Sequence, residues 1–538
     1  MKTAKDIKVA MIGDNFLNRF FNLANIPQKM LNINEAISNT KQLVSEYDAA
    51  NDPNAFHGYL KALYGRTSEG IIDFSLLQPT WNGLTQRIIA IRNIEVIQFF
   101  LKYKRAETMA PTELEEALRA NDKPVLRGGR SFQILEKIGM GILSSEADIH
   151  KPFIGVMRKV LGIRHMDENK YAKDPFKEFK VHFIQTIKSQ TSKLIDEIMK
   201  SKESGKPFKP DFLSYALAIF VNGFYPNLKW TNKRIRNFSK VIEEVSDLAF
   251  KGMMNPYTDE EEIRTQANKK LSLYIDLLLE QDQRFYLGKE YVDELVEKDQ
   301  EHLLREIIIA LLFAGGDNIR KFLEHAFIEL GSDRVRDNYL MGEINDELIE
   351  NLMKETARLY TTIYAQPAVA ANNFQLKVDG KIFNITEGTV FHFSTFASNV
   401  YEKTWGEDAN EFNPTRYNQK GLPNPYQTFG SINRRCEGKF VTKSIVKNLL
   451  KEVLMNSELR WKAKVDGKEN SHQTEFGFNN GTPGNIEFYF ESNDLKHKRN
   501  TKKIEGSYFG NGKQTFYSEN TNKTSDMNNN NYAKLEKN

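Results

Sequence analysis

The sequence of 538 residues contains a single cysteine, Cys436. An internal disulfide is therefore excluded, and one unpaired thiol is typical of a protein from a reducing compartment. The sequence also lacks the H-E-x-x-H and C-x-x-C patterns, so it predicts no zinc site of those kinds. Two interpretations of Cys436 are left, a small buried apolar residue or a reactive or metal-binding thiolate.

Long apolar runs and a strong net charge are missing too. The longest strongly apolar run, 307–316, is about half of what a bilayer-spanning helix requires. The N-terminal segment MKTAKDIKVAMIGDN has too short an apolar core for a secretory signal. The formal net charge is +4 from 75 basic and 71 acidic side chains, which argues against a nucleic-acid partner. We expect a soluble, cytoplasmic protein without a transmembrane helix.

The neighbours of Cys436 favour the thiolate. Arg434 and Arg435 come just before it, and an amphipathic helix is predicted from about Glu437. Backbone dipoles at a helix N-terminus and adjacent guanidinium groups both stabilise a negatively charged sulfur.

The stretch FGSINRRCEG resembles the haem-binding loop of the cytochrome P450 superfamily, F-G-x-G-x-R-x-C-x-G. The matching residues are Phe429, Gly430, Arg434, Cys436 and Gly438, while Ile432 replaces the second glycine. The resemblance implies that Cys436 is the axial ligand of a haem b iron and that Arg434 pairs with a haem propionate. It also implies that Phe429, Gly430 and Gly438 shape the loop against the cofactor. A thiolate ligand favours O–O cleavage.

Residues 302–330 are apolar nearly all round at their centre, which predicts a helix buried inside the domain. Gly315 and Gly316 in mid-helix should each cost about 1 kcal/mol relative to alanine. They indicate either a neighbouring helix that packs closely or a surface kept open for a ligand. The run AGGDN resembles the family's oxygen-activation motif, which implies that Asp317 and Asn318 serve proton delivery, with Asn318 in place of the usual threonine.

Two further motifs follow in the family's order. Glu355 and Arg358 lie three residues apart and share one helical face. Arg416 belongs to FNPTRY, in the place of the family's meander. Taken alone, such ion pairs are surface contacts worth little. The resemblance implies that the three residues lock together as a scaffold for the cysteine loop.

His150 is the candidate for a second propionate contact. The segment from Gly128 resembles the family's approach to its third helix, in which an aromatic residue or histidine is followed one turn later by an arginine. His150 occupies the first position, but Ile154 stands in the second. A solvated helix start is the alternative interpretation.

The expected fold is mainly α with small β-sheets, a cytochrome P450 fold with haem between the long central helix and the cysteine loop. Residues 1–110 are expected to be a helical N-terminal region, partly an extension, with helical apolar spacing in 16–31 and 87–104. Residues 111–493 form the haem domain, with strands and turns over 373–390. The Asn- and Lys-rich tail, 494–538, is expected to be disordered.

The resemblance implies a monooxygenase that uses O₂ and two electrons to oxidise an apolar small molecule such as a lipid or terpenoid. A haem-thiolate isomerase or peroxygenase acting on lipid hydroperoxides is one alternative, and a non-enzymatic or degenerate haem-binding member is another. A monooxygenase needs a separate redox partner, a ferredoxin, a flavodoxin or a diflavin reductase. Four lysines at four-residue spacing form either its docking surface or a solvated helix face. This lysine stripe consists of Lys439, Lys443, Lys447 and Lys451.

Overall fold

A computed structural model describes the fold. The described residues are 33–46, 55–77, 85–103, 126–128, 130–140, 173–174, 177–226, 228, 230–254, 259–279, 297, 302–363, 365–370, 373–378, 381–418, 429, 436–456, 459–469 and 485–490. They are mostly helical, with three small sheets, and this confirms the expected fold class.

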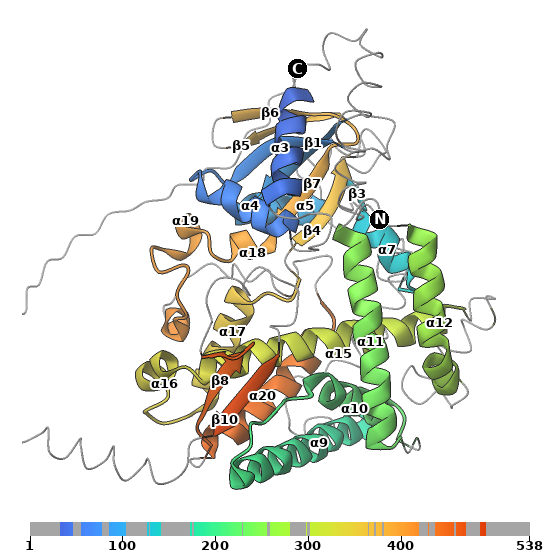
Figure 1. The fold of residues 1–538 in the computed structure, drawn as a ribbon, viewed down its shortest axis with the longest axis vertical. Coiled ribbons are helices and arrows are strands. Elements are labelled where there is room, and N and C mark those ends of the chain that lie inside the picture. The colour runs from blue at the N-terminus through green and yellow to red at the C-terminus, as the bar shows by residue number, and fades with distance from the viewer. Residues whose placement is uncertain are drawn as a thin grey trace, which may run out of the picture.

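Figure 1 shows a helical lower body and an upper part in which α3 and α4 lie with the largest sheet. The helices are α3 (Ile33–Glu46), α4 (Ala55–Gly65), α5 (Ile94–Tyr103), α7 (Arg130–Lys137), α9 (Lys177–Ser204), α10 (Phe212–Phe224), α11 (Asn232–Met254), α12 (Glu260–Leu279), α15 (His302–Leu330), α16 (Asp333–Tyr339), α17 (Asp346–Leu359), α18 (Thr395–Ser398), α19 (Glu402–Trp405), η5 (Pro414–Asn418) and α20 (Lys439–Met455). The strands are β1 (Ile71–Leu77), β2 (Thr85–Ile91), β3 (Leu126–Gly128), β4 (Ala365–Ala370), β5 (Phe374–Val378), β6 (Lys381–Ile385), β7 (Val390–Ser394), β8 (Trp461–Val465), β9 (Lys468–Glu469) and β10 (Ile486–Phe490).

The long helix α15 crosses the helical body, as its sequence predicts (Figure 1). Its glycine pair faces α10. A Cβ atom on Gly315 would lie 2.7 Å from the Phe220 ring, and one on Gly316 would lie 3.0 Å from Leu217. Both distances are shorter than ordinary van der Waals contacts, so the glycines admit a closely packed neighbouring helix. Close helix packing is thus the reason that the structure gives for the glycine pair.

Helices α9, α10 and α20 are joined by one buried polar chain. The Thr191 and Tyr215 hydroxyls lie 2.8 Å apart, and Asn448 Nδ2 donates to Thr191 Oγ1 at 2.9 Å. Tyr215 and Thr191 are buried, so these hydrogen bonds satisfy groups that would otherwise lose water without replacement. The chain fixes α20, and therefore the residue at its start, against the helical body.

The largest sheet, of strand order β1-β2-β7-β4-β3, corrects the helical expectation for part of residues 1–110. Strands β1 and β2 pair antiparallel, and β2 runs parallel to β7. The isoleucine-rich run 88–91 is buried, and periodicity alone cannot separate such a short apolar run from a helix. The run 88–91 forms a strand because it pairs with β7, which lies about 300 residues later in the chain. Residues 94–103 are helical as expected, and 16–31 lie outside the described residues.

The turn signals near residue 380 are confirmed. Strands β5 and β6 form an antiparallel hairpin in which Val378 pairs with Lys381, on either side of the turn-favouring sequence Asp379-Gly380. Gly388 has a positive φ of 87°, which glycine adopts without steric cost. The predicted tail, 494–538, lies outside the described residues. In the part of the chain that the structure describes, no helix combines the length and the apolar character needed to cross a membrane.

Candidate active site

Three of the predicted site residues come together in a buried ionic cluster. Arg358 contacts both carboxylate oxygens of Glu355, at 2.7 Å and 2.9 Å, within α17. Arg416 of η5 donates from Nε to Glu355 Oε1 at 3.0 Å. The backbone N–H of Asn413 and the hydroxyl of Tyr417 complete the set of donors to Glu355. The Glu355 and Arg358 side chains have no exposed area, so this is not a solvated surface pair.

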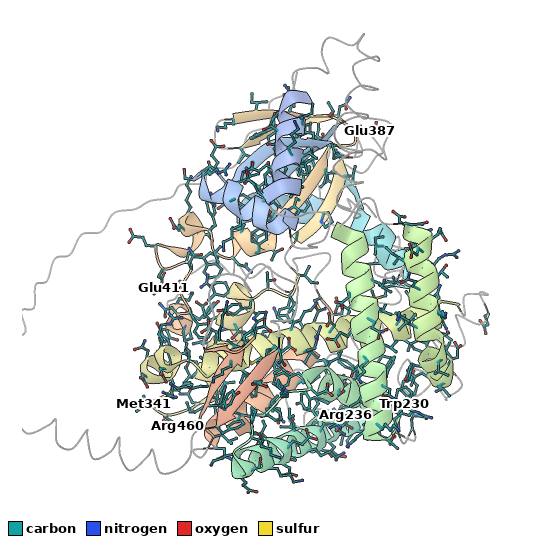
Figure 2. The ribbon with its side chains drawn as sticks, in the orientation of Figure 1. Trp230, Arg236, Met341, Glu387, Glu411 and Arg460 are labelled. Carbon is teal, nitrogen blue, oxygen red and sulfur yellow. The ribbon has the colours of Figure 1, made fainter. Side chains whose placement is uncertain are left out.

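The same arginines bind backbone carbonyl groups that are distant in sequence. Arg358 donates from Nη1 to the Asn399 carbonyl at 2.6 Å and from Nη2 to the Glu411 carbonyl at 2.9 Å. Glu411, labelled in Figure 2, lies in the segment between α19 and η5. Arg416 also pairs with Asp408, at 2.9 Å. Because every contact is buried or half-buried, the cluster fixes α17, the end of α18 and residues 408–417 in one arrangement.

Cys436 lies at the start of α20. Its backbone N–H donates to the Phe429 carbonyl at 2.7 Å, and Lys439, the first residue of α20, has its ammonium 5.8 Å from the centre of the Phe429 ring. The thiol is free and its side chain is exposed. An exposed residue argues against the interpretation of Cys436 as a small apolar core residue. Gly430, Arg434 and Ile432 lie outside the described residues, as does His150.

The surroundings of the Cys436 thiol include groups that raise its pKa and groups that lower it. Cys436 as a whole residue is exposed, but neighbouring protein atoms desolvate its sulfur, and this raises the pKa of Cys436. The backbone N–H groups of Gly438 and Lys439 oppose the rise through hydrogen bonds. No side chain caps the N-terminus of α20, so the sulfur takes the place of a capping acceptor. Because desolvation is the largest of these effects, the neutral thiol is favoured until a cation beside the sulfur stabilises the thiolate.

Asp317 is almost fully buried and its carboxylate is saturated with donors. Arg320 donates twice to Oδ1, at 2.5 Å and 3.0 Å, while Lys321 and the Ser246 hydroxyl contact Oδ2 at 2.7 Å and 2.8 Å. Burial by itself raises the pKa of Asp317, but the ammonium of Lys321 and the guanidinium of Arg320 outweigh it. They hold this pKa well below its usual value. Asp317 is thus ionised at neutral pH while Arg320 and Lys321 contact it.

Asn318 uses its amide differently. Its Nδ2 donates to the Ala314 carbonyl of the preceding turn at 2.7 Å. The half-buried side chain makes no hydrogen bond through Oδ1 to any described residue. Asn318 therefore presents an acceptor, where the threonine of the family's motif would also present a donor.

Two members of the lysine stripe are already paired. Lys447 lies 3.2 Å from Asp346 and 3.4 Å from Glu350, and Lys451 lies 2.9 Å from Asp346. Desolvation lowers the pKa of Lys443. Half of the stripe therefore faces acidic side chains of α17, which reduces its net positive field.

Sequence reasoning missed the partners of Asp317. Arg320 and Lys321 follow it by three and four residues, the spacing at which side chains meet on a helix, so this signal was present in the sequence. Ser246 comes from α11 and carried no such signal. Among the described residues, no group of three or more His, Cys, Asp or Glu side chains could hold a metal ion.

Comparison with known proteins agrees with this arrangement. The family model named Cytochrome P450 matches residues 213–486. Cytochrome P450 monooxygenase milC of Cordyceps militaris is 29% identical over 29% of this chain and 35% of its own length. Indoleacetaldoxime dehydratase of Arabidopsis thaliana is 25% identical over 40% of this chain and 45% of its own length. Ent-kaurene oxidase of Salvia miltiorrhiza is 24% identical over 51% of this chain and 52% of its own length.

These matches therefore span about a third to a half of each relative. The family model covers just over half of the chain and ends beyond α20, so it includes α15, the Glu355 cluster and Cys436. The chain belongs to the cytochrome P450 family.

Proposed function

We propose that the protein is a haem-thiolate monooxygenase, which uses O₂ and two electrons to oxidise an apolar small molecule. The observation that carries the proposal is Cys436: the single free thiol of the chain is exposed at the start of α20, where two backbone N–H groups face it. Glu355, Arg358 and Arg416 form a buried cluster, and we assign it as the scaffold of the cysteine loop. Family membership implies a haem iron, and we propose haem b.

The described residues fit a haem iron. The Cys436 sulfur faces the backbone N–H groups of Gly438 and Lys439, and once deprotonated it is a suitable axial ligand. Bound there, the haem supplies the activation of O₂ that amino-acid side chains lack. A Cβ atom on Gly438 would come to 3.6 Å from the Cys436 sulfur, which is an ordinary van der Waals contact, so Gly438 lies directly beside the ligand atom. We assign Arg434 and His150 to the propionates, and Phe429 and Gly430 to the loop that carries Cys436.

We assign the distal polar roles to Asp317 and Asn318. Asp317 provides a fixed negative charge at the middle of α15, because two cations hold it ionised. Asn318 Oδ1 accepts a hydrogen bond from a bound water or from the substrate. In the family's motif an acid and an alcohol both pass protons. Here we assign a fixed charge to Asp317 and a hydrogen-bond acceptor to Asn318.

A specific observation favours a second candidate, a peroxygenase or isomerase of lipid hydroperoxides. Such an enzyme needs neither a reductase nor a free acid for O₂ activation. All four contacts of Asp317 are intramolecular, so no ready proton donor stands at this position. Consumption of fatty-acid hydroperoxides without added electrons would favour this candidate.

The test of the leading proposal begins with the absorption spectrum of the reduced, carbon monoxide-bound protein. We expect the band characteristic of a thiolate ligand, and its loss in Cys436→Ser with the helical circular dichroism unchanged. Since the chain has no other cysteine, survival of that band in the serine variant would falsify the assignment. Product formation with nicotinamide cofactor and a reductase, compared with hydroperoxide alone, then separates the two candidates.

We further propose that an acidic redox protein, of the ferredoxin or flavodoxin type or the flavin domain of a reductase, docks at the lysine stripe. Lys443 is the better probe, because Lys447 already faces Asp346 and Glu350. Charge reversal in Lys443→Glu should slow haem reduction and weaken its salt dependence while leaving ligand affinity unchanged. A reduction rate equal to that of the wild type would identify the stripe as a solvated helix face.

A further inference from the structure

The spacing along α15 places two buried acids, Asp317 and Glu324, within reach of the same two cations. Arg320 and Lys321 follow Asp317 by three and four residues, and they precede Glu324 by four and three. Side chains three and four residues apart are neighbours on a helix. Each cation therefore lies within one turn of both carboxyl groups, and either acid is within its reach by side-chain rotation.

The structure shows only one of the two possible pairings. Arg320 and Lys321 both bind Asp317, and Arg320 extends outward to Glu243 of α11 at 3.0 Å. Glu324 is 7% exposed and has no hydrogen bond or ion pair with any described residue. Its Oε2 is fully buried without a partner. A buried carboxyl that lacks a donor is costly when ionised, so Glu324 carries a proton in this arrangement.

The charges around Glu324 agree with a neutral acid. The cations Arg320 and Lys321 are already balanced by the anions Asp317 and Glu243. Burial raises the pKa of Glu324 to about 8, against the opposing field of Arg320, and Asp317, Lys321 and Glu243 contribute smaller effects. Asp247 of α11 also faces Asp317 and the two cations, and burial raises its pKa. A further ionised carboxyl would leave the cluster negative.

We propose that Glu324 is a positioning residue that stores a proton for Asp317 and exchanges it when Arg320 and Lys321 move from Asp317 to Glu324. Glu324 and Asp317 lie about 10 Å apart along the helix axis, so the Lys321 ammonium carries the proton between them. One N–H bond of Lys321 breaks as an O–H bond forms on Asp317, and the O–H bond of Glu324 breaks as a new N–H bond forms on Lys321. No electron is transferred, and the total charge of the cluster stays constant. The exchange makes Asp317 a proton donor next to Asn318 only when the cations leave it. The inference rests on the proposed monooxygenase function, which needs protons at this helix.

Infrared spectroscopy of the haem-loaded protein tests the stored proton directly. We expect a carbonyl band of a neutral carboxylic acid at pH 7 that shifts in heavy water and disappears above the pH at which Glu324 ionises. Glu324→Gln should remove this band. The control, Glu329→Gln, changes a second buried glutamate of α15, which binds the Tyr360 hydroxyl, and should retain it. Absence of any Glu324-dependent band at pH 7 overturns the inference.

Turnover separates proton storage from a structural role. Glutamine preserves the shape and neutrality of Glu324, so a structural role predicts wild-type kinetics. Proton storage predicts product formation about 100-fold slower, the lower end of general acid–base effects, and loss of the alkaline limb of the pH profile. Glu324→Asp, which restores an exchangeable proton, should recover part of the rate. Unchanged rate and pH profile in Glu324→Gln overturn the inference.

The experiments also distinguish this inference from the proposed function. If the thiolate-type carbon monoxide band is absent, the proposed function fails whatever Glu324 does. If that band is present and the Glu324-dependent carboxyl band is not, the inference alone fails.

Discussion

At the scale of single residues, the most consequential finding is that Asp317 is a counter-ion as well as a candidate catalytic residue. Its carboxylate neutralises Arg320 and Lys321, whose side chains are only 8% and 11% exposed. A variant that lacks the carboxylate leaves two cations in a nearly dry environment, and the loss of a buried partner is strongly destabilising. Activity lost in such a variant therefore has two possible causes, catalysis and folding.

We predict that Asp317→Ala lowers the free energy of unfolding by roughly 3–5 kcal/mol. Asn318→Ala should cost about 1 kcal/mol or less, because it removes one half-buried hydrogen bond within the helix. Urea denaturation of both variants measures the difference. Equal stability of the two would mean that the Asp317 ion pairs contribute little to folding.

The ionisation of Asp317 also affects the acid side of the stability curve. Its pKa is lower in the folded chain than in the unfolded one. Its contribution is therefore present at pH values above its unfolded pKa and is lost as the pH falls through the folded value. Because that folded value is so low, acid unfolding at moderate pH has to begin at other groups.

Arg358 and Lys381 allow a comparison of a buried ion pair with an exposed one. We predict that Arg358→Met costs roughly 3–5 kcal/mol, because it removes the buried cation that binds both oxygens of Glu355 and that donates to the Asn399, Ala409 and Glu411 carbonyl groups. Lys381→Met breaks a pair with Glu69 in which both side chains are at least half exposed, and should cost about 1 kcal/mol or less. Chemical denaturation monitored by circular dichroism checks both values.

Haem retention gives a second readout for the same pair of variants. If the Glu355 cluster supports the cysteine segment, Arg358→Met should weaken the thiolate-type carbon monoxide band, while Lys381→Met leaves it intact. A full-strength band in Arg358→Met would show that the Glu355 cluster does not support the cysteine loop.

At the scale of elements, the contact between α15 and α10 depends on the glycine pair. We predict that Gly315→Ala destabilises the protein by about 1–3 kcal/mol, because the added methyl group overlaps the Phe220 ring at 2.7 Å. This overlap outweighs the gain in helix propensity that alanine brings. The matched control is Gly342→Ala, where a Cβ atom meets nothing within 4 Å.

A second substitution shows whether the overlap is the cause. Phe220→Leu should recover part of the stability of Gly315→Ala, because the smaller side chain makes room for the methyl group. Additive effects of the two substitutions in thermal denaturation would point to another origin of the loss.

At the scale of the whole molecule, the N-terminal region takes part in the largest sheet. Strands β1 and β2 extend this sheet beyond β7, through parallel pairing of residues 88–91 with 390–393. We predict that a chain without residues 1–91 is aggregation-prone, because the exposed edge of β7 offers unpaired backbone groups to other chains. Removal of 494–538 is the control, and we expect it to leave solubility unchanged because its composition indicates a disordered tail. A soluble truncated chain with an intact carbon monoxide spectrum would show that the N-terminal region is an extension.

The sequence by itself determined the features that depend on local spacing or on family motifs. The helix over 302–330, the hairpin near residue 380 and the pairing of Glu355 with Arg358 follow from periodicity, turn residues and three-residue spacing. These signals are readable because interactions within one or two turns of chain need no distant partner. The cysteine motif indicated the family in the same way, and the match to the family model confirms it.

Only the tertiary structure decided features that involve distant segments. Residues 85–91 form a strand because β1 pairs with all of them and β7 pairs with 88–91. Asp346 and Glu350 of α17 offset the positive charges of Lys447 and Lys451. Arg320 and Lys321 keep Asp317 ionised against the effect of burial, and Ser246 of α11 adds a donor that local spacing does not specify. In each case the outcome depends on which side chains share a low-dielectric environment, and chain spacing does not specify that.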